Sequence, residues 1–369
     1  MTRRPRARKP RGRSRVGEQF EVEVGAIAHG GHCVARLPEP DNRVVFVRHA
    51  LPGERVVVEI TDGTEGDRFW RGDAVSVVEA SPDRVRAPCR YAGPDLCGGC
   101  DFQHVALGRQ RELKADVVRE QVRRLAGLDL EVVVEAVPGD VDGLHWRTRQ
   151  RYVVLPGGRI GMRKHRSHEV VEIDECLIES PDPPSYDVHG RQFAVADEGF
   201  WQVHPGAPEV LVDAVLGALG PRAGEKALDL YAGVGLFARF LAERVGESGW
   251  MVAVEADAAA VEQALTNLAG LASVEVAQGS VEEALRTSYD EPFDLVVLDP
   301  PRTGAKRPVV EQVVARSPRA VAYVACDPAA LARDVAIFAE HGYRLESLRA
   351  FDLFPMTHHV ECVALLTPA

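Results

Sequence analysis

The sequence lacks any long apolar run, because no stretch approaches the ~18 consecutive apolar residues that a membrane-spanning helix requires. It also lacks the pattern of a secretory signal, since the Arg-rich start MTRRPRARKPRGRSR continues into VGEQFEVEV instead of an apolar core. We therefore expect a cytoplasmic protein with no membrane partner. Without export, disulfide bonds are a poor explanation for its seven cysteines, and metal binding or catalysis is a better one.

Charge is distributed unevenly along the chain. The first fifteen residues hold eight Lys or Arg and no acid, whereas the whole chain has a net charge of −11. We interpret residues 1–15 as a disordered basic arm, which is either simply solvated or seeks phosphates through counterion release. Because the rest of the chain is acidic, any contact with nucleic acid is expected to be local.

The length of 369 residues favours several domains. Short alternating runs such as FEVEVG, RVVFVRHA and ERVVVEITD are separated by Gly, Pro and Asp turns, which predicts a small β-barrel over residues 16–80. Small barrels of the oligonucleotide-binding kind offer a groove for single strands, although a pure scaffold is the alternative. Residues 81–190 form a mixed central domain that contains a predicted helix, 106–127, which is expected to pack on the domain that follows.

A basic stripe is predicted at HWRTRQRYVV in the central domain. Alternate residues of a strand share one face, so Arg147, Arg149 and Arg151 would lie together beside Trp146 and Tyr152. Such a face suits phosphates and stacked bases, and it equally suits plain solvation.

Residues 191–369 repeat a rhythm of strand, loop and helix. The four runs KALDLY, WMVAVEAD, FDLVVLDPP and RAVAYVACDP are buried strands joined by helical patterns, and two further strands follow around LESLRAFDLF and VECVALLT. This order predicts an α/β fold with a doubly wound, Rossmann-like parallel sheet. Ligands of such sheets bind at the carboxyl ends of the strands, where the chemical motifs of this chain fall.

Two of those motifs predict a site for an adenosine ligand. The Gly-rich turn of ALDLYAGVGLFA lacks the full G-x-G-x-x-G fingerprint, so dinucleotide binding is poorly supported. Glu255 ends the next strand 20 residues after Gly235, where a carboxylate accepts both ribose hydroxyls; an ordinary strand-end acid is the alternative. Asp299 leads into two prolines, whose fixed φ angles make a rigid wall for a flat base.

The motifs together resemble the S-adenosylmethionine-dependent RNA 5-methyluridine methyltransferases from Val16 onward. The segments that carry the resemblance are VFVRHALPGERV, CGGCDFQH, FWQVHP, DLYAGVGLFA, LDPPRTGA, VACDPAALARD and FPMTHHVE. It implies a TRAM domain for the barrel, a class I methyltransferase domain, S-adenosylmethionine as methyl donor and RNA as substrate. We separately expect a monomer. The resemblance also implies cofactor-binding roles for five residues, which are Gln202, Tyr231, Leu236, Glu255 and Asp299.

Cys326 is the candidate nucleophile, because carbon 5 of uracil accepts a methyl group only after a thiolate has added at carbon 6. It follows a strand, and both the next helix start and Arg333 are expected to lower its pKa, although a buried cysteine often serves only for packing. The resemblance assigns to Glu361 the removal of the proton from carbon 5. His358 or His359 is the alternative base.

Four other cysteines form a candidate metal site. Cys89, Cys97 and Cys100 lie in CRYAGPDLCGGC, and Cys176 lies in IDECLI. Four thiolates suit either zinc or an iron–sulfur cube, and spacing does not separate the two. The resemblance implies a structural 4Fe-4S cluster in preference to zinc, although the seven-residue gap after Cys89 is longer than is usual in the family; free thiols are the remaining alternative.

Two substitutions depart from the family pattern. Asp327 stands where asparagine is common and adds negative charge beside the nucleophile, while Ser280 replaces an acid often found near the adenine. Cys33, inside the predicted barrel, has no assigned role. Two other functions stay open: a degenerate enzyme that only binds or chaperones RNA, and a cytosine-5 methyltransferase. Among RNA substrates, the cysteine set favours 23S ribosomal RNA over transfer RNA.

Overall fold

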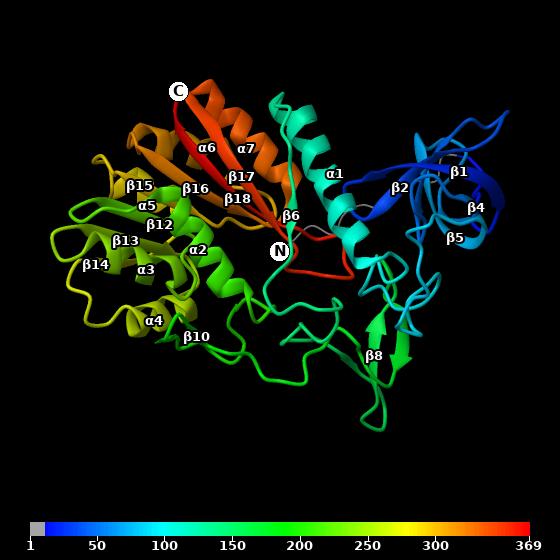
Figure 1. Cartoon of the computed structure of the whole chain (residues 1–369), viewed down its shortest axis with the longest axis horizontal. Helices are drawn as coiled ribbons and strands as arrows, with labels where there is room; N and C mark the ends of the chain where they lie inside the picture. Colours follow the sequence, from blue (N-terminus) through cyan, green and yellow to red (C-terminus); the bar gives the residue numbers. More distant parts are fainter. Residues whose placement is uncertain (1–11) are drawn as a thin grey trace. The chain divides into compact units, whose positions relative to one another are not determined.

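The computed structural model describes residues 12–369, which fall into two compact units (Figure 1). The barrel unit comprises the described residues up to Leu113, together with Arg151–Leu177 and Met356–His358. The sheet unit comprises Lys114–Gln150, Ile178–Pro355 and His359–Ala369. Most of the predicted basic arm, residues 1–11, lies outside the described residues, and the predicted central segment 81–190 is divided between the two units.

Five strands of the barrel unit close into a barrel in the order β1-β2-β3-β5-β4. They are β1 (Gln19–Ala28), β2 (His32–Arg36), β3 (Val44–Arg48), β4 (Arg55–Asp62) and β5 (Phe69–Glu79). Alternate residues point inward, so that Val56, Val58 and Ile60 of β4 are buried while their neighbours reach solvent. Trp70 fills the interior, and its indole N–H donates to the carbonyl oxygen of Thr64 at 2.7 Å. The predicted small barrel is confirmed.

The barrel unit also contains a short antiparallel sheet. Its strands are β7 (Val153–Val154), β8 (Ile160–Arg163) and β9 (Val170–Ile173). The loop that carries Cys97 is attached to the end of β8, because the Gly98 N–H donates to the Arg163 carbonyl at 3.0 Å. A side chain at Gly98 would collide with the backbone of His165, so only glycine allows this approach.

The sheet unit is built on an eight-stranded sheet in the order β14-β13-β12-β15-β16-β18-β17-β6. The strands are β6 (Val134–Glu135), β12 (Lys226–Leu230), β13 (Trp250–Glu255), β14 (Val274–Gln278), β15 (Leu295–Leu298), β16 (Ala320–Ala325), β17 (Tyr343–Phe351) and β18 (Glu361–Pro368), with a separate pair β10 (Asp187–Val188) and β11 (Arg191–Gln192). The helices of the chain are α1 (Leu107–Ala126), α2 (Ala207–Leu219), α3 (Leu236–Val245), α4 (Ala258–Asn267), α5 (Val281–Thr287), α6 (Lys306–Ala315) and α7 (Pro328–Glu340). Among the described residues, none of these helices combines the length and apolar character that a bilayer crossing requires.

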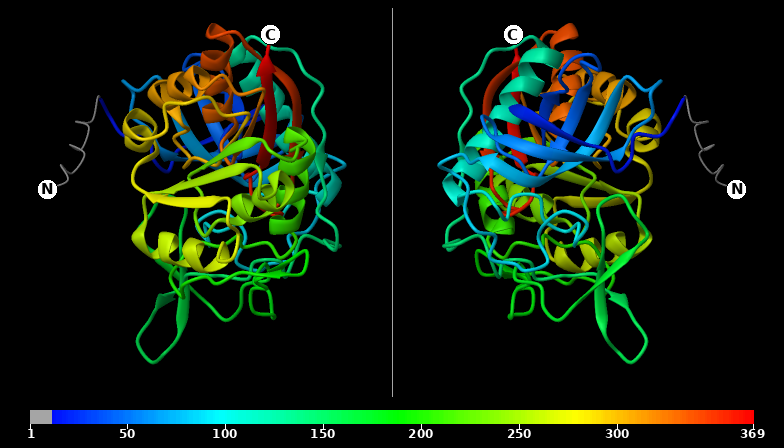
Figure 2. Two further views of the ribbon diagram at one scale, coloured as in Figure 1. Left: turned by 90° about the vertical axis from the view of Figure 1, so that its left-hand side faces the viewer. Right: turned by 90° about the vertical axis from the view of Figure 1, so that its right-hand side faces the viewer.

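Apolar side chains bury both faces of this sheet. In β12, Leu228 and Leu230 belong to one core, whereas Ala227 belongs to the other, as expected when successive side chains point to opposite faces. Helices lie on both sides of the strands, and the red C-terminal strand β18 runs inside the sheet between β16 and β17 (Figures 1 and 2). The predicted doubly wound α/β fold is confirmed. β14 was not predicted, because its sequence VEVAQ is only partly buried at the sheet edge.

The predicted basic strand at residues 146–152 does not form. Arg147 makes an isolated bridge with Glu179, and Thr148 donates its N–H to the Val203 carbonyl at 2.9 Å. The segment is thus held by two separate partners instead of a neighbouring strand, and the three arginines share no strand face. Trp146 is buried and stacks on His204 with ring centroids 5.9 Å apart, so its ring is not presented to solvent.

A buried ion pair joins Lys114 of α1 to Asp352 after β17, and both residues belong to the sheet unit. The Lys114 ammonium donates to the Asp352 carboxylate and, at 3.0 Å, to the Phe354 carbonyl, and both charged side chains are fully buried. We expect Lys114→Met to lower the free energy of unfolding by about 3 kcal/mol, because it leaves a buried carboxylate unpaired. Urea denaturation measures this change. The double variant Lys114→Met/Asp352→Leu should recover most of the loss, and equal losses in both variants would contradict this account.

Candidate active site

A cavity of about 830 Å³ opens at the edge of the sheet where the parallel strands end. Successive strands deliver one reactive or polar side chain each to its wall: Tyr231 follows β12, Glu255 ends β13, Asp299 follows β15, Cys326 follows β16 and Glu361 begins the antiparallel strand β18. The carboxyl ends of parallel strands meet at one edge, and an antiparallel neighbour starts there. The Cys326 sulfur and the glycine turn at Gly233 therefore share one cavity.

The glycine turn and Glu255 hold one another in place. Gly233 and Gly235 have φ angles of 55° and 84°, a left-handed conformation that favours glycine. The Gly233 N–H donates to Glu255 Oε2 at 2.8 Å, while Oε1 accepts from the N–H groups of Ala256 and Asp257 at 2.7 and 2.8 Å. A carboxylate has about four acceptor sites, so Glu255 keeps capacity for a hydroxyl-bearing ligand.

Four of the five residues predicted to bind a cofactor line this cavity, namely Gln202, Tyr231, Glu255 and Asp299. The fifth, Leu236, starts α3 and packs into the core with only 8% of its surface exposed, and it is not among the lining residues. Ser280 caps the N-terminus of α5 by accepting from the Glu283 N–H at 3.3 Å. It does not line the cavity, so its replacement of an acid does not alter the cavity wall.

The environment of Cys326 favours the protonated thiol at neutral pH. Burial raises its pKa to about 11, the neighbouring carboxyls of Glu361 and Asp299 raise it too, and the Arg302 guanidinium lowers it. The cation that acts on the thiol is thus Arg302 of the Asp-Pro-Pro-Arg turn, not the predicted Arg333. A ligand that neutralised the two carboxyls would favour the thiolate.

Asp327 acts on the helix that follows the nucleophile. Its carboxylate accepts from the Ala330 N–H at 2.8 Å and caps the N-terminus of α7. The substitution thereby gains a structural role, and the carboxyls that raise the pKa of Cys326 are Glu361 and Asp299. Cys362 faces away from the cavity into the core, as strand alternation predicts.

Three carboxyl groups lie at or near the cavity wall: Asp299 and Glu361 line it, and Asp229 is fully buried behind it in β12. Burial raises the pKa of Asp229 to about 7 and that of Asp299 to about 7, and it raises the pKa of Glu361 well above its ordinary value. Asp229 Oδ2 accepts from the Ala238 N–H at 2.8 Å, whereas Oδ1 has no hydrogen-bond partner within residues 12–369. A cation bound in the cavity would favour the ionised forms of all three. Sequence reasoning missed Asp229, although the run DLYAGVG places this acid in the strand that leads into the glycine turn.

Aromatic and basic side chains form the rest of the wall. Phe354 contacts Trp146 and His359 edge to face, at centroid distances of 6.1 and 5.9 Å. Phe200 lines the cavity with 73% of its surface exposed, and Arg147 also contributes. These residues were not predicted as site residues, because no spacing rule connects the loops that bring them together.

Of the two histidines considered as an alternative base to Glu361, only His359 lines the cavity. His359 lines the cavity, and its Nε2 lies 3.5 Å from Arg302 Nη2. His358 belongs to the barrel unit, where its Nδ1 lies 2.6 Å from Asp101 Oδ2. Glu361 and His359 therefore both remain within the cavity wall.

The raised thiol pKa predicts a pH dependence of Cys326 alkylation. Because the pKa of Cys326 is about 11 and only the thiolate reacts, the rate of modification by iodoacetamide should rise about tenfold per pH unit between about pH 7 and 10. Peptide mass spectrometry follows the reaction at this residue, with buried Cys362 as the unreactive control. A rate independent of pH over this range would contradict the assigned environment.

The four cysteines predicted to bind metal lie in the barrel unit. The Gly99 N–H and the Gln103 amide donate to the sulfurs of Cys97 and Cys100, each at 3.4 Å. Burial raises the thiol pKa of Cys89, Cys97 and Cys100, and in each case Cys176 raises it further. The sulfurs are thus within electrostatic reach of one another. Within residues 12–369, however, no three His, Cys, Asp or Glu side chains have the arrangement of a metal site.

Cys33 has a separate, structural environment. It is fully buried in the barrel core, its thiol donates to the Ala50 carbonyl at 3.5 Å, and burial raises its pKa to about 12. The residue therefore packs the barrel interior.

Two family models match the chain. Residues 13–75 match the TRAM domain, and residues 185–369 match the model described as tRNA (Uracil-5-)-methyltransferase. The second match contains every residue of the cavity wall except Arg147.

Proteins similar along their whole length include an uncharacterized RNA methyltransferase of Streptomyces avermitilis, which is 46% identical over 96% of this chain and 99% of its own. One from Bifidobacterium longum is 36% identical over 95% and 97%. Among solved structures, the tRNA (uracil-54, C5)-methyltransferase of Pyrococcus abyssi in complex with S-adenosyl-L-homocysteine matches with a TM-score of 0.65 and 24% identity, covering 94% of this chain and 99% of that one. This likeness shows a shared fold.

Proposed function

The chain belongs to the tRNA (uracil-5-)-methyltransferase family, and we propose that it methylates carbon 5 of one uridine in RNA by covalent catalysis from Cys326. The observation that carries the proposal is the shared cavity: Cys326 and Glu361 open onto the same space as the glycine turn and Glu255. One cavity can therefore hold the methyl donor beside the glycine turn and the uracil ring beside the nucleophile and the candidate base.

The cavity residues fit S-adenosylmethionine as the second substrate. Glu255 has free acceptor capacity for ribose hydroxyls, and the Pro300–Pro301 turn supplies a flat, rigid wall. The carboxyls of Asp229 and Asp299, whose pKa values are raised by burial, suit a cationic ligand. When bound, this substrate supplies an electrophilic methyl group.

Cys326 and Glu361 then divide the chemistry between them. The Cys326 thiolate adds to carbon 6 of the uracil ring, which gives carbon 5 the electron density to attack the sulfonium methyl group, and S-adenosyl-L-homocysteine leaves. Glu361 next removes the proton from carbon 5, the electron pair of that bond re-forms the double bond between carbons 5 and 6, and the thiolate is expelled. Arg302 lowers the pKa of the thiol and so favours its reactive form. His359 is the second candidate for the base, since it lines the same cavity.

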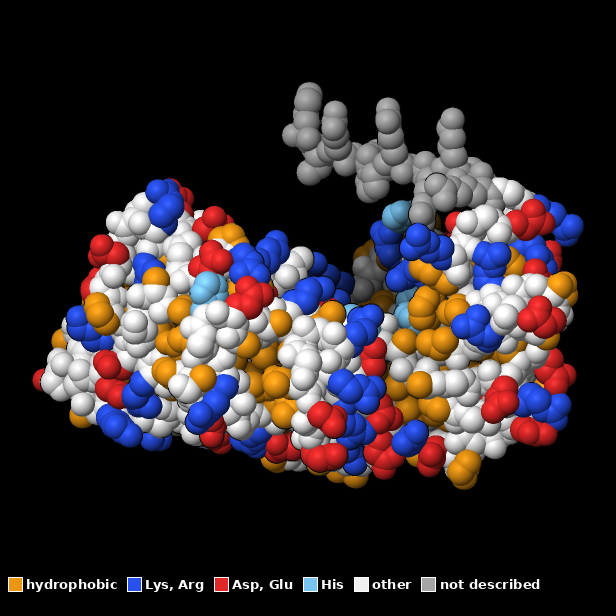
Figure 3. Space-filling view, turned by 90° about the horizontal axis from the view of Figure 1, so that it is seen from above, with side chains coloured by type: hydrophobic (Ala, Val, Ile, Leu, Met, Phe, Trp, Pro, Cys, Tyr) orange, Lys and Arg blue, Asp and Glu red, His pale blue; other side chains and the backbone are white. Residues whose placement is uncertain are grey.

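The target uridine has to leave its stack before a thiolate can approach carbon 6. Positive and negative side chains are interspersed over the face in Figure 3, which agrees with RNA contacts that depend on local groups instead of net charge. The nucleotides that flank the target uridine would be bound by the TRAM barrel. We propose 23S ribosomal RNA as the first candidate substrate on the strength of the cysteine set, and transfer RNA as the second.

Mapping of 5-methyluridine tests this function. RNA from a strain without the gene should lack the modification at one position, and the purified protein with S-adenosylmethionine should restore it. Nucleoside mass analysis separates the alternatives, because a cytosine-5 enzyme would yield 5-methylcytidine. Binding of RNA without any methylated product would instead indicate a degenerate, chaperone-like protein.

We further propose that Cys89, Cys97, Cys100 and Cys176 hold a 4Fe-4S cluster, with zinc as the alternative. Four sulfurs within electrostatic reach of one another and N–H donors to two of them support this. A bound metal would offset the mutual repulsion of the thiolates. The cluster would order the loops of the barrel unit and takes no part in the proposed chemistry.

Metal content tests the cluster. Protein purified without oxygen should contain iron and acid-labile sulfide in equal amounts, and Cys97→Ser should lose most of both together with affinity for RNA. Cys326→Ala, which alters a cysteine outside the set, is the matched control and should keep the metal. Zinc in place of iron would contradict the cluster, and a Cys97→Ser protein that stayed folded and bound RNA fully would contradict its ordering role.

A further inference from the structure

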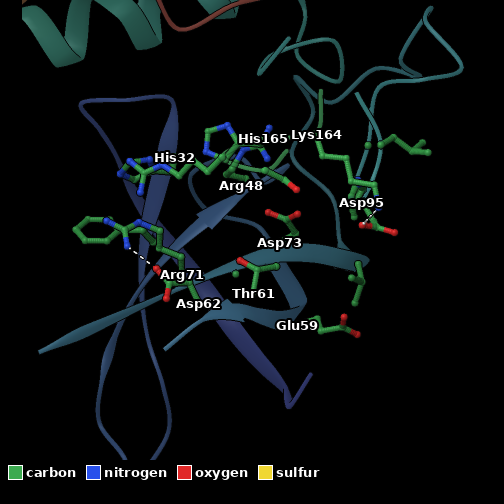
Figure 4. Close-up of a pocket in the computed structure, with 18 of the residues that line it drawn as sticks. His32, Arg48, Glu59, Thr61, Asp62, Arg71, Asp73, Asp95, Lys164 and His165 are labelled. Carbon is green, nitrogen blue, oxygen red and sulfur yellow. Dashed lines mark hydrogen bonds and ion pairs between the residues drawn. The ribbon is translucent and has the colours of Figure 1, made fainter. Parts of the chain in front are cut away.

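A second cavity, of about 510 Å³, lies within the barrel unit (Figure 4). Its wall is formed by strands β3, β4 and β5 of the barrel, the start of β2 with the turn before it, the loop 93–96 and the turn after β8. Its size is within the range of sites for small organic ligands. Neither the catalytic chemistry nor the cysteine set uses this space.

Asp73 is a buried carboxyl in this wall whose hydrogen-bonding capacity is unused. Only 8% of its surface is exposed, and among residues 12–369 no hydrogen bond or ion pair to its carboxylate is found. The other acids are engaged: Asp62 pairs with Arg71, Asp95 with Lys164, and Glu59 with Gln19. Its oxygens are not among the fully buried unpaired atoms, and the residue lines the cavity, so Asp73 is open to a ligand that carries N–H groups.

Arg48 is a cation in the same wall that makes a long ion pair. Its side chain is 12% exposed, and its buried Nη2 atom lies 3.8 Å from Asp101 Oδ1 and makes no hydrogen bond among the described residues. The other oxygen of Asp101 is already held by His358 at 2.6 Å. Arg166 adds a second positive charge on the turn after β8, where no ion pair engages it among the described residues. These guanidiniums favour an anionic group.

Arg48 and Asp73 are neighbours in this wall, because they are paired in register on the adjacent strands β3 and β5, and the Arg48 charge acts against the burial that raises the pKa of Asp73. In Figure 4, His32 and His165 lie near Arg48, whereas Thr61 and Glu59 lie near Asp73. Burial lowers the pKa of His32 and of His165 to about 4, with Arg166 lowering both further, so both rings are neutral and able to accept or donate one hydrogen bond. His32 also contacts the Phe46 ring edge to face at 4.8 Å, which provides an aromatic contact for a base.

We propose that this cavity binds one nucleotide of the substrate RNA other than the methylated uridine, with its phosphate at Arg48 and Arg166 and an amino-bearing base at Asp73. A simple anion would be repelled by Asp73 and a simple cation by Arg48, whereas a nucleotide carries both complementary groups. Guanine offers a carboxylate two adjacent N–H donors, and cytosine and adenine each offer an amino group. Uracil offers one N–H between two carbonyl oxygens, so it is disfavoured.

The test uses two variants and one matched control. It rests on the proposed function, because the RNA probe is built around the uridine that the enzyme methylates. The variants are Asp73→Asn and Arg166→Gln, and the control is Arg163→Gln, three residues away on β8, where Arg163 bonds His168 at 2.8 Å outside the cavity. The probe is an oligonucleotide around the mapped uridine with randomised flanks. Dissociation constants by fluorescence anisotropy and methylation by sequencing are measured separately, so that binding and chemistry are distinguishable.

We expect the wild-type protein to disfavour uridine about tenfold at one flanking position, and we expect Asp73→Asn to abolish that preference. Arg166→Gln should raise the dissociation constant and KM about tenfold with kcat unchanged, because a contact remote from the reacting atoms affects both states equally. Arg166 is exposed, so this variant stays informative if Asp73→Asn fails to fold. The proposal would be overturned if Asp73→Asn and Arg166→Gln both matched Arg163→Gln in their affinity for RNA and in their bias against uridine at the flanking position. Selective binding without methylation would overturn the proposed function and leave this inference standing.

Discussion

Replacing Cys326 with alanine is expected to lower kcat/KM for methyl transfer by about 10⁴-fold or more, because nothing else in the cavity wall can add to carbon 6 of the ring. The substitution leaves the binding surfaces in place, so affinity for RNA and for S-adenosylmethionine should change by less than about threefold. Tritium transfer from labelled donor into RNA measures the rate.

Cys362→Ala is the matched control for this variant. Cys362 lies only a strand away in the sheet, paired in register with Ala325, and it faces the core. This variant should keep its full rate per folded molecule, since its thiol does not open onto the cavity. Turnover by Cys326→Ala comparable to that of the control would remove the covalent mechanism.

Glu361→Gln is expected to stop the reaction after methyl transfer instead of before it. Glutamine has nearly the same size but accepts no proton, so the proton on carbon 5 stays and the thiolate is not expelled. A covalent protein–RNA adduct should therefore accumulate, with turnover reduced by about 10²- to 10⁴-fold. A denaturing gel shows the adduct as a band of lower mobility that contains both protein and RNA.

His359→Gln distinguishes the two candidate bases. His359 lines the same cavity but lies in the loop before β18, whereas Glu361 is the first residue of that strand. If Glu361 is the base, His359→Gln releases its product and accumulates no adduct. An adduct that accumulated in His359→Gln and not in Glu361→Gln would reverse the assignment.

The fold was accessible from sequence because its signals are local. The barrel strands alternate, as Val56, Val58 and Ile60 show, and the parallel strands of the sheet are short, nearly continuous apolar runs. β14 was missed because it lies at the edge of the sheet, where its residues are only partly buried and do not form a continuous apolar run. The stretch around Arg149 was misread for the opposite reason: it alternates like a strand, but its hydrogen bonds go to separate loops.

The candidate site was predictable only where residues follow strand ends. Cys326, Asp299 and Glu255 were placed correctly at one edge because parallel strands bring their carboxyl ends together. The electrostatics were not predictable, because they depend on loops that meet in space. Arg302 lowers the thiol pKa where Arg333 was predicted to do so, and burial, which the sequence prediction did not include, raises it.

The central claim, a bond between the Cys326 sulfur and a pyrimidine ring, is tested most directly by mass spectrometry of the trapped protein. Glu361→Gln is incubated with S-adenosylmethionine and substrate RNA and then digested with nuclease and trypsin. The account predicts one modified peptide, the one that contains Cys326, heavier by a methylated uridine nucleotide. Attachment at any other residue, or complete methylation of the RNA with no nucleotide-bearing peptide, would contradict it.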